Sequence, residues 1–583
     1  MKDFETLEKE FHTYNPLIFN LSHIDKTDVI GSTYDVKFSN SICFPEFKLG
    51  FHHYIHKTKD KMSVVEEYGN RKKIYLVTSL FEKNIDYKEK TNSDVDFTSI
   101  DSGVKSFIKS IKPDFPPLLN RAFLKMWEIL VEFDLIPETE NFVSSHLAEG
   151  PGSFIQATIL YREMLSKLGK IKSVSKDNYY GVTLHSDHEH LLMQQDFIKY
   201  FAKEPHNRLH IMETKSIEQL KDLYGGGGNL ASAPITNGDL TKLNTIRQFA
   251  GGKIPEGKNF KDVESFAKPS DLITSDGGFD WKRENLQEQE AYKLIFSEIL
   301  TALKLQKDDG NFVIKIFETY TKITIKLIQM LRQIYSQVYI SKPYTSRISN
   351  SEKYIVCKGF KKSLISSKII LKLEEQLETI NKNNQYQILD IFTDINLSDS
   401  VYNAYKQINL DLQVKQYVGI NNIIKFLNLD NYNGIEFNEY LDKQIVAAHF
   451  WNNMFLEPKL FTKIVKYFKS YNFIEYKKNN ILDNDNNLSS DNIESVESKP
   501  ETISEVNTET KSKPENKKSK TNKSTKMNKS TNQKGGGIKL DSDTDTGINA
   551  MIYDDVSIGS SDNIVGHLDS DNETNYIMDL NKI

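Results

Sequence analysis

Asp271-Leu-Ile-Thr-Ser-Asp-Gly-Gly-Phe-Asp280 is the stretch that decides how the rest of the chain folds. A short apolar run ends in Asp276, as expected where a buried parallel strand delivers a carboxylate to the carboxyl edge of a sheet. Two glycines follow directly, and glycine lets another molecule approach the backbone closely. On its own, this pattern fits an ordinary strand-to-loop turn equally well, so its meaning depends on the remaining sequence.

Length and composition narrow the class of protein. The chain has 583 residues and a net charge of -5, so it is longer than one ordinary domain and has no global basic signature. Its two cysteines, Cys43 and Cys357, cannot form a disulfide framework or a cysteine-rich zinc site, which favours a reducing compartment. No apolar run reaches the roughly 18 residues of a membrane span, so we expect no membrane contact.

Strands and helices alternate between residues 140 and 360, which predicts an α/β fold with a mostly parallel, seven-stranded sheet covered by helices. The expected strands begin near Phe142, Tyr179, Arg208, Asp271, Asn311, Val338 and Tyr354. A short polar loop joins the last two, which predicts an antiparallel hairpin closing one edge of the sheet. The flanking composition predicts a mixed α/β N-terminal extension (1–110), the α/β domain (111–362), a helical C-terminal region (363–482) and a disordered low-complexity tail (483–583).

The segment around residues 142–168 has the strand, glycine turn and helix of a nucleotide-type binding loop. Its turn, Glu149-Gly-Pro-Gly-Ser-Phe154, is neither a phosphate loop nor a full GxGxxG, which suits a ligand with adenosine but no pyrophosphate. Asp187 follows the second strand, where an acid often holds a ribose, although it would serve equally well as a helix cap. Asp239 follows a turn and is expected either to meet a purine edge or to cap the run beginning at Leu240.

Four ionisable residues are expected to gather at the carboxyl edge of the sheet. Asp276 ends the fourth strand, Lys315 lies inside the fifth, and Glu352 stands at the entrance of the seventh. Lys125, on the helix before the first strand, can complete the group. A lysine whose pKa is lowered by burial and by a second ammonium can accept the proton of an attacking hydroxyl. A purely structural cluster of buried ion pairs explains the same residues equally well.

Five stretches resemble a known family. They are Asn120-Arg-Ala-Phe-Leu-Lys-Met-Trp127, Leu147-Ala-Glu-Gly-Pro-Gly-Ser-Phe154, Ser275-Asp-Gly-Gly-Phe-Asp280, Phe312-Val-Ile-Lys-Ile-Phe317 and the segment 342–357. In this order they resemble the FtsJ-like (RrmJ-type) ribose 2'-O-methyltransferases, specifically the mRNA cap-specific branch of eukaryotes and large DNA viruses. The resemblance implies a Rossmann-like domain that binds S-adenosyl-L-methionine and needs no metal for methyl transfer.

The resemblance also assigns roles to residues. It implies a Lys-Asp-Lys-Glu tetrad formed by Lys125, Asp276, Lys315 and Glu352, with Lys315 as the general base. The residues expected to contact the cofactor are Glu149, Gly150, Pro151, Gly152, Ser153, Phe154, Asp187, Asp239 and Asp276. The chain departs from the family at His146, where many members have an acid whose role Glu149 would partly take over. It departs again at Ser153, where a glycine is common.

The function implied by the resemblance is methylation of the first transcribed nucleotide of capped mRNA, converting cap 0 to cap 1. Two alternatives stay open: a ribosomal or transfer RNA 2'-O-methyltransferase, and a non-catalytic RNA-binding subunit of a capping or polyadenylation complex. The expected partner is RNA, and the tail offers a docking segment for capping or transcription machinery. The expected location is intracellular: the cytoplasm, a virus factory or virion if the source is viral, or the nucleus.

Overall fold

The computed structural model describes most of the chain up to Ser470. The described residues are 4–14, 17–43, 46, 56–61, 79–82, 100–186, 192–224, 235–256, 259–278, 286–429 and 435–470. Asp187, the glycine run 225–228 and the tail 483–583 lie outside these ranges. No helix in the described part is long and apolar enough to cross a membrane.

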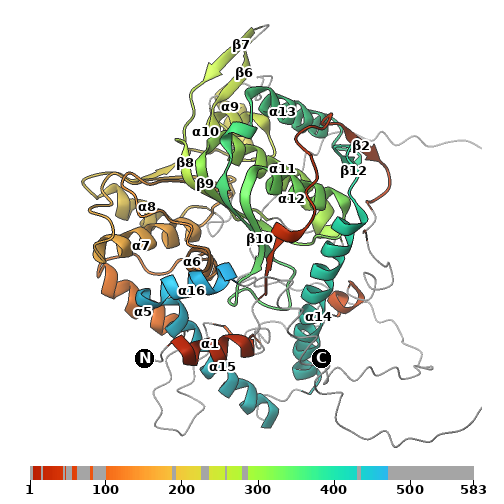
Figure 1. Cartoon of the computed structure of the whole chain (residues 1–583). Helices are drawn as coiled ribbons and strands as arrows, with labels where there is room; N and C mark the ends of the chain where they lie inside the picture. Colours follow the sequence, from red (N-terminus) through yellow and green to blue (C-terminus); the bar gives the residue numbers. More distant parts are fainter. Residues whose placement is uncertain are drawn as a thin grey trace, which may run out of the picture. The chain divides into compact units, whose positions relative to one another are not determined.

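An eight-stranded sheet forms the centre of the protein (Figure 1). Its strands, in spatial order, are β1 (Leu17–Asn20), β10 (Tyr335–Lys342), β11 (Lys353–Phe360), β9 (Gln306–Ile316), β8 (Ser270–Ser275), β3 (Val143–Leu147), β4 (Asn178–Val182) and β5 (Leu209–Ile211). Neighbouring strands from β9 to β5 are parallel, whereas β11 is antiparallel to both β9 and β10. All seven expected strands are present, so the predicted fold class is confirmed.

One strand was not expected. β1 comes from the N-terminal extension and pairs antiparallel with β10, with Leu17 opposite Lys342. Without β1, the outer edge of β10 would expose a row of unpaired backbone groups. The predicted β10–β11 hairpin is therefore present, but β1 rather than the hairpin forms the edge of the sheet.

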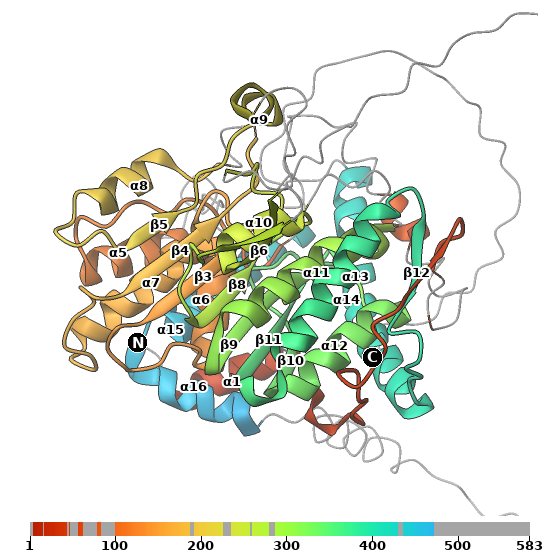
Figure 2. The same cartoon turned by 90° about the horizontal axis from the view of Figure 1, so that it is seen from above.

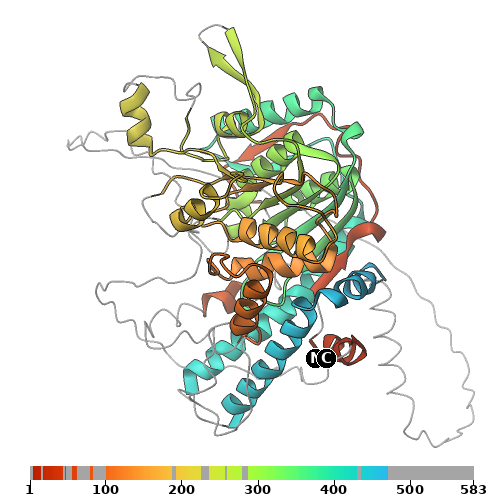
Figure 3. The same cartoon turned by 90° about the vertical axis from the view of Figure 1, so that its left-hand side faces the viewer.

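Helices cover both faces of the sheet, as Figure 2 shows. The layer on one face is built from α5 (Ile100–Ile111), α6 (Ala122–Phe133), α7 (Ser153–Lys167) and α8 (Gln195–Ala202). The layer on the other face is built from α10 (Leu243–Ala250), α11 (Gln287–Leu305) and α12 (Lys322–Ile334). Since both faces are covered, nearly all residues of the inner strands β3 and β8 are buried, including polar ones such as Ser144, Ser145 and His146. Between β5 and β8 the chain also forms α9 (Ile217–Tyr224) and a β6–β7 hairpin (Gly252–Glu256, Asn259–Val263) that projects from the sheet (Figure 3).

The C-terminal helices join the same two hydrophobic cores. α13 (Ser367–Lys382) and α14 (Asp399–Leu429) contribute to the core beside α11 and α12. α15 (Ile435–Phe455) and α16 (Pro458–Ser470) contribute to the core beside α5 and α6, where α15 also contacts α1 (Phe4–Tyr14). A small antiparallel sheet pairs β2 (Val36–Ser39) with β12 (Gln387–Ile391). The described parts of both flanking regions therefore pack on the α/β domain instead of forming cores of their own.

Candidate active site

The fold brings the four predicted tetrad residues together at the carboxyl edge of the sheet. Asp276 directly follows β8, and its backbone N–H donates to the carbonyl of Leu147 at the end of β3. Lys315 lies near the end of β9, the parallel neighbour of β8. Glu352 immediately precedes β11, which runs back alongside β9. Lys125 reaches this edge from α6.

The tetrad consists of two ion pairs. Lys315 Nζ lies 3.0 Å from Asp276 Oδ1 and also donates to the Asp276 backbone carbonyl at 2.9 Å. Lys125 Nζ lies 2.9 Å from Glu352 Oε1 and 3.0 Å from its Oε2. The side chains of Lys315 and Asp276 are only 7% and 12% exposed, so both charges are largely removed from water. Such a pair is stable only with partners in place, which each of these residues has.

The charge state of Lys315 differs from the neutral form expected from the sequence. Burial lowers the pKa of Lys315, but the carboxylates of Asp276 and Glu352 outweigh it, and the net pKa is raised above the usual value. Burial likewise works against the charge of Glu352, yet Lys125 and Lys315 bring its pKa down to about 2. Lys315 is therefore an ammonium, kept charged chiefly by Asp276 and Glu352. The expectation that burial and Lys125 keep Lys315 neutral is wrong.

Two further side chains, which sequence reasoning missed, belong to this cluster. Glu298 on α11 is buried, and burial raises its pKa to about 8 against the opposing effects of the Ser275 hydroxyl and Lys315. Tyr354 lies opposite Lys315 where β9 and β11 pair. Burial is the main reason that the pKa of Tyr354 is raised, and the negative charges of Glu352 and Asp276 add to the effect. A glutamate inside an otherwise apolar helix face was the only local indication of Glu298.

The expected cofactor loop lies at the same edge, between β3 and α7. The Glu149 carboxylate points back into the protein and accepts from the backbone N–H groups of Phe154 (2.8 Å) and Ile155 (3.0 Å). The Gly150 amide donates to the Thr183 hydroxyl at the end of β4. The amides that could hold a phosphate at the start of α7 are thus occupied by a carboxylate. This arrangement disfavours a pyrophosphate and fits a cationic, adenosine-bearing ligand such as S-adenosyl-L-methionine.

The rest of the loop is packed against its surroundings. Gly152 has a φ of +116°, and a Cβ there would lie 2.9 Å from the Met193 side chain. The Ser153 hydroxyl donates to Asn120 at 2.8 Å, so the departure from glycine is accommodated. Pro151 and Phe154 are buried. His146, the other departure, is fully buried between Ser144 and Thr274, and burial lowers its pKa to about 3.

Asp239 also lies near this edge. Gly238 packs so closely on the end of β4 that a Cβ there would lie 2.0 Å from the Thr183 carbonyl oxygen. The Asp239 carboxylate accepts from the backbone N–H (2.9 Å) and hydroxyl (2.7 Å) of Thr241. These bonds form a local turn before α10, which begins at Leu243 with Lys242 as its N-cap, so Asp239 does not cap this helix, and its expected contact with a purine edge stays a prediction. Asp187 lies outside the described residues.

The loop between β10 and β11, residues 343–352, carries Glu352 and is held from several directions. Glu128, one helical turn after Lys125 on α6, accepts from the backbone N–H groups of Tyr344 (2.6 Å) and Thr345 (2.9 Å). The same carboxylate accepts from the indole N–H of Trp451 on α15 at 3.0 Å. The C-terminal helices are thereby connected to the loop that carries a tetrad member.

The N-terminal extension holds the same loop. Glu82 is buried and pairs with Arg121 at 2.9 Å and with Arg347 at 3.1 Å. Arg121 in turn donates to the Thr345 carbonyl at 2.6 Å. Residues before and after the α/β domain therefore contribute directly to the geometry of its active-site loop.

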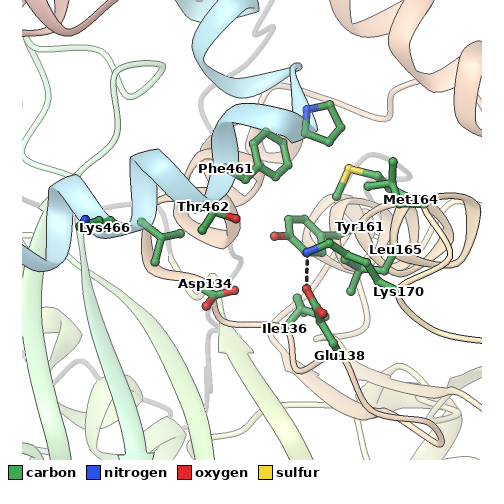
Figure 4. Close-up of a pocket in the computed structure, with 13 residues that line it drawn as sticks. Asp134, Ile136, Glu138, Tyr161, Met164, Leu165, Lys170, Phe461, Thr462 and Lys466 are labelled. Atoms are coloured by element: carbon green, nitrogen blue, oxygen red, sulfur yellow. Dashed lines mark hydrogen bonds and ion pairs between the residues drawn. The ribbon is translucent and has the colours of Figure 1, made fainter. Parts of the chain in front are cut away.

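A separate cavity of about 410 Å³ lies between α7, α16 and the loop after α6 (Figure 4). Apolar side chains such as Tyr161, Met164 and Phe461 line it, with Asp134 and Lys466 among its charged residues. None of the tetrad residues lines this cavity. It is therefore distinct from the tetrad site.

The strand order and the acid–lysine cluster at the carboxyl edge define a Rossmann-like, S-adenosylmethionine-dependent methyltransferase fold. Residues 118–360 match the FtsJ-like methyltransferase family. This segment contains all four tetrad residues.

Similar proteins carry a more specific name. The chain is 29% identical over 296 residues to cap-specific mRNA (nucleoside-2'-O-)-methyltransferase 1 of Bos taurus, covering 48% of this chain and 30% of that protein. It is 32% identical over 174 residues to the protein of the same name from Danio rerio, covering 30% and 19%. The chain thus matches less than a third of the length of these relatives.

Among solved structures, a ribosomal RNA methyltransferase from Plasmodium falciparum is 16% identical, and the match covers 42% of this chain and 98% of that one. The TM-score is 0.24, so the fold assignment rests on the strand order and the family match instead.

Proposed function

We propose that this protein is an S-adenosylmethionine-dependent RNA ribose 2'-O-methyltransferase that acts on the first transcribed nucleotide of capped mRNA. The observation that carries the proposal is the buried pairing of Lys315 with Asp276 beside Lys125 and Glu352. The name shared by the Bos taurus and Danio rerio relatives supports the choice of capped mRNA as substrate. For partners, we propose RNA as substrate and the tail, residues 483–583, as a docking segment for capping machinery.

When bound, S-adenosyl-L-methionine would supply an electrophilic methyl group, and the Gly150–Phe154 loop with Asp276 would hold it. Lys315, in its amine form, would accept the proton that the ribose 2'-hydroxyl gives up as its oxygen takes the methyl group. Lys315 must first lose its own proton, since the surrounding carboxylates keep it charged in the free protein. Asp276 fixes the position of Lys315 Nζ, and Glu352 does the same for Lys125.

The decisive experiment incubates the full chain with labelled S-adenosylmethionine and cap-0 RNA, followed by nuclease digestion to locate the methyl group. We expect label on the ribose of the first transcribed nucleotide. The Lys315→Ala variant should bind S-adenosylmethionine but transfer no methyl group, and retained activity would exclude Lys315 as the base.

The same assay tests the alternatives. Equal methylation of an uncapped transcript would favour a ribosomal or transfer RNA substrate over the cap. RNA binding without methyl transfer to any capped substrate would favour the non-catalytic RNA-binding subunit.

A further inference from the structure

We propose that Lys342 is a positioning residue that sets the orientation of Glu352 and, through it, of Lys125. The inference rests on the proposed function, because it concerns the tetrad of that same site. Lys342 is the last residue of β10, and its side chain is buried beneath the loop that carries Glu352.

Lys342 directly precedes this loop, and its side-chain nitrogen contacts the opposite end of the loop. Its Nζ donates to the backbone carbonyl of Glu352 at 2.7 Å. It also donates to the backbone carbonyl of Asn350 at 3.0 Å and to the Asn350 side-chain oxygen at 2.8 Å. A single cation therefore closes the loop on itself immediately before β11 begins.

Ser346 extends this contact to the Glu352 carboxylate. Its hydroxyl oxygen accepts from Lys342 Nζ at 3.2 Å, while the hydroxyl donates to Glu352 Oε1 at 3.0 Å. That same oxygen, Oε1, lies 2.9 Å from Lys125 Nζ. A continuous chain of contacts thus runs from Lys342 through Ser346 and Glu352 to Lys125.

If position 342 served only to fill space in the core, an apolar side chain would be more favourable there than a lysine. Burial and the neighbouring cations Lys353, Lys125 and Lys59 lower the pKa of Lys342 to about 7, and Glu352 opposes this shift. Replacing a buried charge by a well-packed apolar side chain is often neutral or stabilising. A lysine at this position is better explained by the loop oxygens that its Nζ contacts.

The test compares Lys342→Met with Lys368→Met, an exposed lysine on α13 that serves as the matched control. We expect kcat with cap-0 RNA to fall at least about tenfold in Lys342→Met, with S-adenosylmethionine affinity within about twofold of wild type. Lys368→Met should keep the wild-type kcat. An unchanged kcat in Lys342→Met would overturn the proposal.

A double-mutant cycle separates positioning from a general loss of stability. If Lys342 acts through Glu352, adding Lys342→Met to Glu352→Gln should lower kcat by less than about twofold further. Losses that multiply would show that Lys342 acts independently of Glu352 and would contradict the proposal.

A crystal structure of Lys342→Met gives a readout that does not depend on activity. We expect the Glu352 carboxylate to have left Lys125, whereas an intact ion pair at the wild-type distance would refute the positioning role. If the wild-type protein methylated no capped RNA, the proposed function would fail, and this structural comparison would still decide the role of Lys342.

Discussion

Lys315 holds Asp276 at two different atoms. Its Nζ donates to the Asp276 backbone carbonyl at 2.9 Å and pairs with the Asp276 carboxylate at 3.0 Å. One side chain from β9 therefore fixes both the main chain and the acid at the end of β8. Because the contact restrains the backbone, it also determines where Gly277 and Gly278 lie.

The raised pKa of Lys315 predicts the pH dependence of methyl transfer. Below its pKa, the fraction of Lys315 in the basic form rises about tenfold per pH unit, so kcat/KM should increase from about pH 7 towards pH 10. Glu298→Gln removes a carboxylate that raises this pKa, and should shift the acid limb to lower pH. Steady-state rates across this range provide the measurement, and identical profiles for the two proteins would contradict it.

The stability of the protein should depend on the titration of Glu298. Burial raises the pKa of Glu298 from 4.5 to about 8, so the folded protein keeps a proton that the unfolded chain loses within this window. This contribution to stability is complete below pH 4.5 and is lost as the pH rises through about 8.

Glu298→Gln cannot titrate, so it should gain stability relative to wild type by up to about 1.4 kcal/mol per pH unit across that window. Urea unfolding at several pH values measures the difference. A pH-independent difference between the two proteins would show that Glu298 has the same pKa in the folded and unfolded states, which would contradict the prediction.

The two glycines after Asp276 should respond differently to substitution. A Cβ on Gly277 would lie 2.2 Å from Glu298 Oε1 and 2.7 Å from Leu294, whereas one on Gly278 would come no closer than 3.5 Å, to Lys315 Nζ. We expect Gly277→Ala to lower the free energy of unfolding by about 1–3 kcal/mol, as overpacking does. Gly278→Ala is the matched control and should fold with nearly wild-type stability. Equal losses in denaturant titrations would contradict this steric argument.

Trp451→Phe should make the loop of residues 343–352 less firmly held, although Trp451 lies on α15 and outside the tetrad. The substitution removes a donor from the buried Glu128 carboxylate, which should cost about 1–3 kcal/mol. Trp127→Phe is the control, because its indole bonds only to the backbone carbonyl of Phe455. We expect kcat for methyl transfer to fall in Trp451→Phe more than in Trp127→Phe. Equal effects would show that the Trp451 contact has no influence on residues 343–352.

The inner strands could be predicted because short runs with apolar residues, such as Asp271–Ser275 and Phe312–Phe317, alternate with helical segments and end at glycine or polar residues. Their shared carboxyl edge then placed Asp276, Lys315 and Glu352 together before the geometry was known. β1 could not be predicted, since its four residues have no distinctive pattern and their partner strand lies at the far end of the domain.

The burial of Glu298 had only a weak indication in the sequence, namely its place on an otherwise apolar face of α11. It depends on how closely Gly277 approaches α11, which is a tertiary contact. The charge state of Lys315 could not be predicted from the sequence, because it depends on how closely Asp276 and Glu352 approach its Nζ compared with the effect of burial.

The contact between Trp451 and Glu128 gives the protein an intrinsic optical reporter. Indole emission responds to a nearby charge, and the carboxylate that Trp451 contacts is also bonded to Tyr344 and Thr345 in the active-site loop. Movement of this loop when RNA binds should therefore change tryptophan fluorescence. Stopped-flow mixing would then measure any such movement in real time with no added label, and loss of the signal in Trp451→Phe would identify its source.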